Sequence, residues 1–255
     1  MKVMNRMLVA MCVLFVLGSN AMSSESEEES IGFEVTADYF GKYLWRGQTL
    51  NDDPVFQPGL SMAYGGLSAG IWGSMELTDI YGTKDEFTEI DLYADYSADV
   101  PGVEGLGFSV GFVYYDFPNT TFTETTELYW GFGLDTILSP SVTVSHDIDS
   151  ADGGIYISAG IGHTIELGED SPVAIDLGAS YGWGNKEYNN YYWGVDKDLS
   201  NDLSFSAAMP IDIDGWCITP SVNYTVLIDS DIKHTDMFSA DDEEFFFGIG
   251  LSKAF

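Results

Sequence analysis

Residues 173–183 read Val-Ala-Ile-Asp-Leu-Gly-Ala-Ser-Tyr-Gly-Trp, in which large apolar side chains recur at every second position. Successive side chains of an extended chain point to opposite faces, so one face of this segment is apolar and the other is small or polar. Its eleven residues are also enough for a tilted β-strand to cross a lipid bilayer. The stretch therefore predicts one strand of a transmembrane β-barrel.

The same alternation recurs along the rest of the chain. The other expected strands are 33–45, 55–64, 67–77, 88–100, 106–117, 124–137, 141–149, 155–166, 199–209, 216–227 and 244–255. We predict an all-β fold, an antiparallel up-and-down barrel of about twelve strands, because an even count is typical of bacterial single-chain barrels. A secreted β-sandwich or lipocalin-like barrel also alternates, but such folds seldom keep so regular a pattern over so many segments.

The connections and the aromatic residues agree with a membrane barrel. Compact connections with Gly or Pro lie at 65–66, 101–102, 139–140, 168–172 and 210–215, whereas long ones lie at 184–198 and 228–243. Short periplasmic turns and longer outer loops are typical of outer-membrane barrels. Aromatic residues of the outward phase near strand ends predict two interfacial girdles, and they are Tyr43, Trp45, Tyr64, Phe108, Tyr114, Tyr181, Trp183, Trp216 and Tyr224.

The N-terminal region predicts export. Residues 1–21 combine a basic start, a short apolar run and small residues at a cleavage position, which is typical of a cleaved secretory signal peptide. Residues 22–31 have the composition of an acidic disordered leader. We expect residues 32–255 to form a single barrel domain in the outer membrane.

The charge of the chain excludes nucleic acid as a partner. The sequence has 41 acidic and 9 basic residues, and the signal peptide carries two of the basic ones, so the mature charge is 7 − 41 = −34. Phosphate backbones are bound by clusters of Lys and Arg, which this chain lacks. Loss of Cys12 with the signal peptide leaves Cys217 as the one cysteine, so we expect no internal disulfide.

The chain ends on an aromatic residue, Phe255, which follows apolar residues of the same phase, namely Phe245, Phe247, Ile249 and Leu251. This ending resembles the C-terminal signal that barrel-assembly machinery reads. Lys253 departs from the pattern, because an apolar or aromatic residue usually occupies that position. We expect the assembly machinery and outer-membrane lipid as partners.

Three short motifs carry a family resemblance: Tyr43-Leu44-Trp45-Arg46-Gly47, Pro54-Val55-Phe56-Gln57-Pro58 and Gly70-Ile71-Trp72-Gly73-Ser74. Together with the terminal Phe they resemble the TorF-like porin family, a set of exported and largely uncharacterised bacterial proteins. The resemblance covers residues 33–255 and is most specific over 39–72. It implies an outer-membrane barrel with a pore role but no particular solute. The residues that match the family motif are Tyr43, Trp45, Arg46, Gly47, Pro54 and Gln57.

Charged and aromatic residues of the inward phase are candidates for the lining or constriction of a pore. They are Glu34, Asp38, Lys42, Arg46, Trp72, Glu76, Glu89, Asp91, Asp95 and Glu127. An excess of acids over Lys42 and Arg46 would make the lumen attractive to cations. The alternative is a ladder of ion pairs that only holds the strands together. The large inward aromatic residues also predict a narrow or plugged lumen.

Motifs for catalysis and metal binding are weak. Gly66-Leu67-Ser68-Ala69-Gly70 matches G-x-S-x-G but lies where a hairpin enters a strand, and a nucleophile elbow needs a strand followed by a helix. His146, His163 and His234 have no spacing typical of a triad or a metal site. The acids of 147–152 depart from the spacing of a calcium loop. We predict no enzyme activity, no catalytic residues, no cofactor and no metal site.

The sequence thus favours a porin-like outer-membrane channel for passive diffusion of small hydrophilic solutes, with a preference for cations. The alternative is a non-conducting barrel with a structural or loop-mediated binding role. A membrane-embedded hydrolase is a more distant alternative. The sequence leaves the transported solute and the oligomeric state open.

Overall fold

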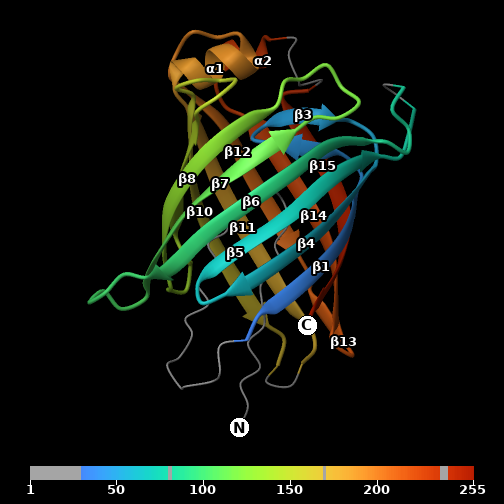
Figure 1. The fold of residues 1–255 in the computed structure, drawn as a ribbon, viewed down its shortest axis with the longest axis vertical. Coiled ribbons are helices and arrows are strands. Elements are labelled where there is room, and N and C mark those ends of the chain that lie inside the picture. The colour runs from blue at the N-terminus through green and yellow to red at the C-terminus, as the bar shows by residue number, and fades with distance from the viewer. Residues whose placement is uncertain (1–29, 80–81, 169–170, 236–240) are drawn as a thin grey trace.

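A computed structural model describes residues 30–79, 82–168, 171–235 and 241–255 and shows a closed antiparallel β-barrel (Figure 1). Neighbouring strands pair in the order β12-β11-β10-β9-β8-β7-β6-β5-β4-β1-β15-β14, and a further pairing of β12 with β14 closes the wall. This confirms the predicted twelve-stranded barrel. The expected signal peptide, 1–21, and nearly all of the expected leader, 22–31, lie outside the described residues.

The barrel strands follow the predicted segments closely along most of the chain. They are β1 (Gly32–Phe40), β4 (Val55–Tyr64), β5 (Leu67–Glu76), β6 (Phe87–Asp99), β7 (Leu106–Asp116), β8 (Thr125–Leu134), β9 (Ser141–Asp147), β10 (Ile155–Glu166), β11 (Ala174–Gly184), β12 (Leu199–Ala208), β14 (Trp216–Leu227) and β15 (Glu243–Ala254). Each strand runs antiparallel to both neighbours, so the backbone N–H and C=O groups of the wall pair in continuous ladders, with a register shift between β5 and β6 and another between β11 and β12. A closed wall of this kind leaves no unpaired strand edge in contact with lipid.

The two ends of the barrel differ. One end carries the helices α1 (Lys186–Trp193) and α2 (Ser230–Lys233), and we call it the helical end. We call the opposite end the terminal end. It holds the start of β1, the C-terminus and the short strand β13 (Ile211–Ile213), as Figure 1 shows. Neither helix within the described ranges is long and apolar enough to cross a bilayer.

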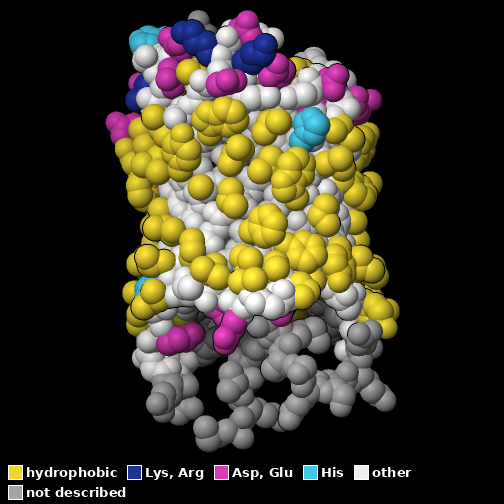
Figure 2. All heavy atoms as spheres, turned by 90° about the vertical axis from the view of Figure 1, so that its left-hand side faces the viewer, with side chains coloured by type: hydrophobic (Ala, Val, Ile, Leu, Met, Phe, Trp, Pro, Cys, Tyr) yellow, Lys and Arg dark blue, Asp and Glu magenta, His cyan; other side chains and the backbone are white. Residues whose placement is uncertain are grey.

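The outer face of the wall is apolar. Exposed large side chains such as Leu60, Leu92, Val110 and Ile161 alternate with inward-facing small or polar ones. Figure 2 shows one face of the wall, across which hydrophobic side chains form a broad band, while most acidic and basic side chains on that face gather at the helical end. An apolar band between two polar ends is the surface that a bilayer requires.

The first predicted strand is wrong in its second half. The segment 33–45 was expected to be one strand, but β1 ends at Phe40 and the chain then forms a hairpin of β2 (Tyr43–Trp45) and β3 (Gln48–Asn51). Arg46 and Gly47, the two residues between these strands, have φ angles of 50° and 80°. Positive φ at both central positions is the geometry of a type I′ hairpin turn.

This hairpin folds into the barrel and not along its wall. Tyr43 and Trp45, which were expected in an outward aromatic girdle, are only 6% and 7% exposed and pack in the interior. Period-two alternation is the same for a strand that faces lipid and for one that faces the lumen, so the pattern could not separate the two placements.

A hairpin that crosses the lumen: candidate pore constriction

The hairpin Tyr43–Asn51, which we call the lumenal hairpin, reaches from β1 to the opposite wall. Its tip residue Arg46 contacts β8 through Glu127 and β10 through Tyr156. In the order of the sheet, β8 and β10 each lie five strands away from β1, in opposite directions around the barrel. The hairpin therefore spans the full width of the lumen near the helical end.

Aromatic contacts fix the hairpin along its length. The ring of Tyr43 lies 5.8 Å from that of Trp72 on β5, measured between centroids. The ring of Trp45 lies 6.0 Å from Tyr115 on β7 and 5.3 Å from Tyr192 on α1. Helix α1 thus packs on the hairpin from the helical end, and the hairpin connects the loops of that end with the wall.

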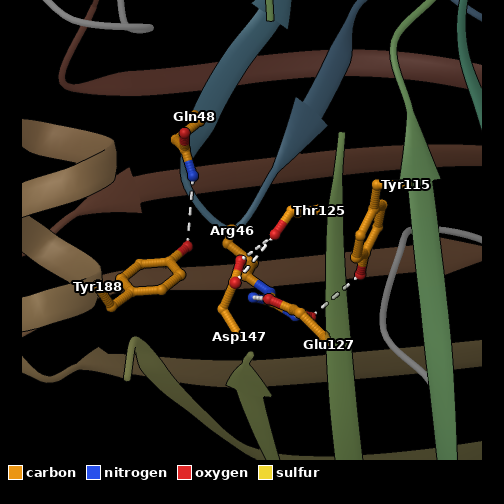
Figure 3. A network of polar contacts seen from close by, with 7 residues as sticks. All are labelled: Arg46, Gln48, Tyr115, Thr125, Glu127, Asp147 and Tyr188. Carbon is orange, nitrogen blue, oxygen red and sulfur yellow. Dashed lines mark hydrogen bonds and ion pairs between the residues drawn. The ribbon is translucent and has the colours of Figure 1, made fainter. Parts of the chain in front are cut away.

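A bidentate ion pair holds the tip. Both terminal nitrogens of Arg46 donate to Glu127, each at 2.7 Å, and the Tyr115 hydroxyl donates to the same carboxylate at 3.1 Å (Figure 3). The side chains of Arg46 and Glu127 are only 10% and 3% exposed. A desolvated pair with fork geometry is far more directional than a surface ion pair.

Aromatic rings surround the Arg46 guanidinium. Its central carbon lies 4.3 Å from the centroid of Trp45, 4.6 Å from that of Tyr156 and 5.9 Å from that of Tyr188. Cations bind favourably over the faces of such rings, and more so where water is excluded. The Tyr188 hydroxyl also accepts a hydrogen bond of 3.3 Å from Gln48. Burial raises the pKa of Tyr188, so this phenol stays protonated.

Lys42 anchors the base of the hairpin. It lies in the bend between β1 and β2 and donates to Glu244 on β15 at 2.7 Å, and it also pairs with Asp52. Thr49 on β3 donates to the other oxygen of Glu244 at 3.4 Å. Both inward basic candidates therefore belong to the hairpin connection and not to the wall strands.

The structure places the other candidate residues on the inward face of the wall. The amide of Gln57 donates a hydrogen bond of 3.3 Å to Ser74. Glu76 accepts a hydrogen bond from Thr83, and Asp95 accepts one of 2.5 Å from Ser68. Pro54 precedes β4. Residues of the inward phase on β1 and β6 complete the set, and they are Glu34, Asp38, Glu89 and Asp91.

Acids exceed bases inside the barrel. Of the described basic residues, Lys42 and Arg46 are the two that pair with lumenal acids, Glu244 and Glu127. Lys253 faces outward, over the ring of Trp216. The remaining described basic residues lie in connections or helices of the helical end, and they are Lys84, Lys186, Lys197 and Lys233. The inward acids of β1 and β6 therefore have no basic ion-pair partner among the described residues.

Inward tyrosines lie flat against the wall. A Cβ at Gly70 would stand 2.4 Å from the Tyr93 hydroxyl, and one at Gly111 would stand 2.6 Å from that of Tyr129. Each ring thus covers a glycine of the neighbouring strand, where any side chain would displace it. The aromatic residues of the hairpin and its partners thus pack together in the interior, whereas these wall tyrosines lie along the wall.

The lumen changes character toward the terminal end. Many inward positions of the strands there are occupied by Gly, Ser and Thr, and the acids Glu34, Asp95 and Asp176 lie among them. The small residues include Ser61, Ser68, Gly131, Thr143, Gly160, Thr164, Gly178, Ser206, Ser221 and Ser252. Small hydroxyl side chains fill little space and are readily hydrated. The barrel thus joins a packed half at the helical end to a half lined by small polar groups and a few acids.

The weak catalytic and calcium motifs have ordinary structural roles. Ser68 lies on β5 and donates to Asp95. Asp147 accepts hydrogen bonds from the backbone N–H of Asp149 and Ala151, at 2.9 and 3.1 Å, and therefore closes a turn. Across the described parts of the chain, no group of three or more His, Cys, Asp or Glu is placed to hold a metal ion.

Several partners of the hairpin were missed from the sequence. Tyr188 and Tyr192 lie in α1, inside a segment expected to be only a long outer loop, and Gln48 belongs to the turn region of the hairpin itself. Asn185 before α1 accepts from the N–H of Tyr188, as a helix N-cap does. Asn185 and the aromatic residues that follow it, Tyr188, Tyr191, Tyr192 and Trp193, were the signals in the sequence that could have indicated a helix.

Comparison with known proteins gives a family and a fold. The profile of a family described as a bacterial protein of unknown function (Gcw_chp) matches residues 26–238. The structure of the KdgM porin aligns with a TM-score of 0.53 at 9% identity, over 87% of this chain and 99% of that one. KdgM porin in complex with disordered oligogalacturonate gives 0.52 at 9% identity, over 88% and 99%.

An outer membrane channel from Pseudomonas putida F1 aligns with a TM-score of 0.48 at 8% identity, over 92% of this chain and 98% of that one. No curated protein matches the sequence. The alignments with KdgM show a porin-type barrel fold. The fold and the family match agree with the resemblance to a porin family, which rests on the sequence motifs around Trp45.

Proposed function

Because this chain belongs to the Gcw_chp family of bacterial proteins and has a porin-type barrel fold, we propose that it is an outer-membrane channel for small hydrophilic solutes. The observation that carries the proposal is a closed wall that is apolar outside and polar, with an acid excess, inside. A barrel whose interior only had to pack would be stabilised more by apolar side chains, because burying unpaired carboxylates costs free energy.

The half of the lumen at the terminal end supports a water-filled vestibule. Its Gly, Ser and Thr side chains are small, and its hydroxyl and carboxylate groups offer hydrogen bonds to water. We place this end on the periplasmic side, because short turns lie there and the long connections with α1 and α2 lie at the other. The lumenal hairpin then forms the constriction toward the outside.

The proposed preference for cations follows from the charges that face the lumen. Glu89, Asp91 and Asp95 follow one another on the inward face of β6. The two lumenal cations, Lys42 and Arg46, are each already paired with a carboxylate. A solute in the lumen therefore meets a negative potential, which raises the local concentration of cations.

A non-conducting barrel is the second candidate function. The packing of the hairpin against Tyr115, Tyr156 and α1 favours it, because these side chains fill the centre of the lumen at the helical end. In that case the loops of the helical end would bind a partner. We propose no enzyme activity for either candidate.

Reconstitution of the mature protein into planar lipid bilayers tests the channel. Under a salt gradient we expect a current whose reversal potential has the sign of cation selectivity. Raising the salt should weaken the selectivity, because the screening length falls from about 10 Å at 0.1 M to about 3 Å at 1 M. Anion-selective current would contradict the charged lumen, and complete absence of current would favour the non-conducting barrel.

Cell fractionation tests the proposed location. The mature protein should sediment with the outer membrane and migrate faster on gels when unheated than when boiled, because a folded barrel resists detergent. Recovery of the native protein as a soluble periplasmic species would show that the apolar band does not contact lipid.

A further inference from the structure

The tip of the lumenal hairpin occupies a site that contains more anionic groups than one arginine needs. Glu127 receives both hydrogen bonds of the Arg46 guanidinium. A second carboxylate, Asp202 on β12, lies beside the hairpin tip, where a Cβ added to Gly47 would stand 3.0 Å from that of Asp202. Asp202 accepts a hydrogen bond of 2.8 Å from Tyr156, whose ring faces the Arg46 guanidinium. One cation therefore lies among two nearly fully buried carboxylates, which are 2% and 3% exposed.

Most of this site does not belong to the hairpin. Glu127 and Asp202 lie on β8 and β12, Tyr115 and Tyr156 on β7 and β10, and Tyr188 on α1. Of the groups around the guanidinium, only Trp45 moves with Arg46. The wall and α1 thus form a carboxylate and aromatic site, and the chain places one of its own side chains in it.

Contacts other than those with Arg46 also hold the rings in place. Tyr156 lies directly against Gly182, and a Cβ at Gly184 would stand 2.6 Å from the Tyr188 ring. The Tyr156 hydroxyl is further held by Asp202. Rings that cannot rotate lose little freedom when a cation binds, so the site is preorganised.

The geometry suits one class of cation. A guanidinium is planar, donates two parallel hydrogen bonds to a carboxylate and stacks on aromatic faces, whereas an ammonium ion is a compact charge without a plane. We propose that Glu127, Asp202, Tyr115, Tyr156 and Tyr188 form a binding site for small solutes that carry a guanidinium group. In the structure Arg46 occupies this site as a tethered ligand.

This inference rests on the proposed channel function and names the substrate class for it. A guanidinium solute that passes the constriction would take the place of Arg46. A tethered group has an effective concentration on the order of millimolar, so a free solute must reach comparable concentrations to compete with it. The wild-type site is thus filled by Arg46 at low solute concentration.

Binding measurements on Arg46→Ala test the site without requiring conduction. We titrate the folded variant in detergent with ethylguanidinium and, in parallel, with the neutral analogue ethylurea. Ethylguanidinium should bind saturably, ethylurea should not bind, and the wild type should bind neither at these concentrations. Addition of Glu127→Gln to the variant should weaken binding about tenfold or more, because hydrogen bonds to a charged group are lost.

Arg46→Gly is the second variant, because φ at this position is 50° and glycine adopts it without strain. Lys186→Ala, which removes a positive charge from the exposed helix α1, is the matched control and should behave as the wild type. Unheated gel migration identifies the folded variants. If neither folded Arg46 variant binds ethylguanidinium more tightly than the wild type does, the site proposal is wrong.

Bilayer recordings separate this inference from the channel proposal. In Arg46→Gly, ethylguanidinium should reduce the current at concentrations that leave Lys186→Ala unaffected. If ethylguanidinium neither binds nor changes the current, the proposed site is wrong and the proposed channel function still stands. Saturable binding without any current would support the site and overturn the channel.

Discussion

Arg46 and Glu127 are joined by two hydrogen bonds of 2.7 Å across the barrel, although 81 residues separate them in the sequence. Arg46 is at the tip of a hairpin that starts from β1, and Glu127 is on β8. The pair therefore attaches the hairpin to the far wall.

Glu127→Gln should loosen the hairpin. Removing one partner of a buried ion pair leaves the other charge without its hydrogen-bonded partner, which costs up to about 3–5 kcal/mol, and less where Asp202 compensates part of the Arg46 charge. We expect a lower thermal unfolding temperature and, if the barrel conducts, a larger and noisier current in bilayers. The control is Glu124→Gln, which changes an exposed acid in the preceding connection and should leave both measurements at the wild-type level. Equal behaviour of the two variants would mean that the pair does not hold the hairpin.

Gly47→Ala should displace the hairpin tip. Gly47 has a φ of 80°, and an added Cβ would stand 2.8 Å from Leu227 and 3.0 Å from Asp202. The control Gly215→Ala has a similar φ of 78° but open space around the added Cβ. Both variants incur roughly 1–2 kcal/mol of backbone strain, so a greater loss of thermal stability in Gly47→Ala isolates the steric contact. The same loss in both would contradict tight packing of the tip.

Leu177→Arg should impair assembly, whereas Ser206→Arg should be tolerated. Leu177 is 44% exposed on the outer face of β11, and Ser206 pairs with the adjacent Gly178 but faces inward. A cation that faces lipid near the bilayer midplane costs about 2–4 kcal/mol. The measurement is the folded fraction in the outer membrane by unheated gel migration. If Ser206→Arg failed and Leu177→Arg assembled, the inward and outward faces would be reversed.

Replacing Glu89, Asp91 and Asp95 by their amides should reduce cation selectivity. The change replaces three ionisable carboxyl groups on the inward face of β6 by neutral amides with little change of shape. The reversal potential under a salt gradient should move toward zero, and most strongly at low ionic strength. The control replaces Asp79 and Asp85, which lie in the connection at the helical end, by Asn. An unchanged reversal potential in the triple variant would remove these acids from the permeation path.

The wall of the barrel could be predicted because each residue in it responds to its immediate surroundings. Leu177 faces lipid and Asp176 faces the lumen, and such alternation appears directly in the sequence with a period of two. Gly and Pro mark the tight turns for the same local reason, since only particular residues adopt those backbone angles. Strand number, strand phase and the polarity of the two faces were therefore determined by the sequence alone.

The constriction was decided by tertiary structure. Tyr43 and Trp45 have the period-two spacing of lipid-facing residues, and only the closed wall shows that they point into an interior. The partners of Arg46 come from β7, β8, β10 and α1, and no local pattern links them to residue 46. The surroundings of a charged side chain such as that of Arg46 depend on closure of the barrel. Closure brings the opposite wall within reach of the hairpin, so that Arg46 contacts a carboxylate instead of water or lipid.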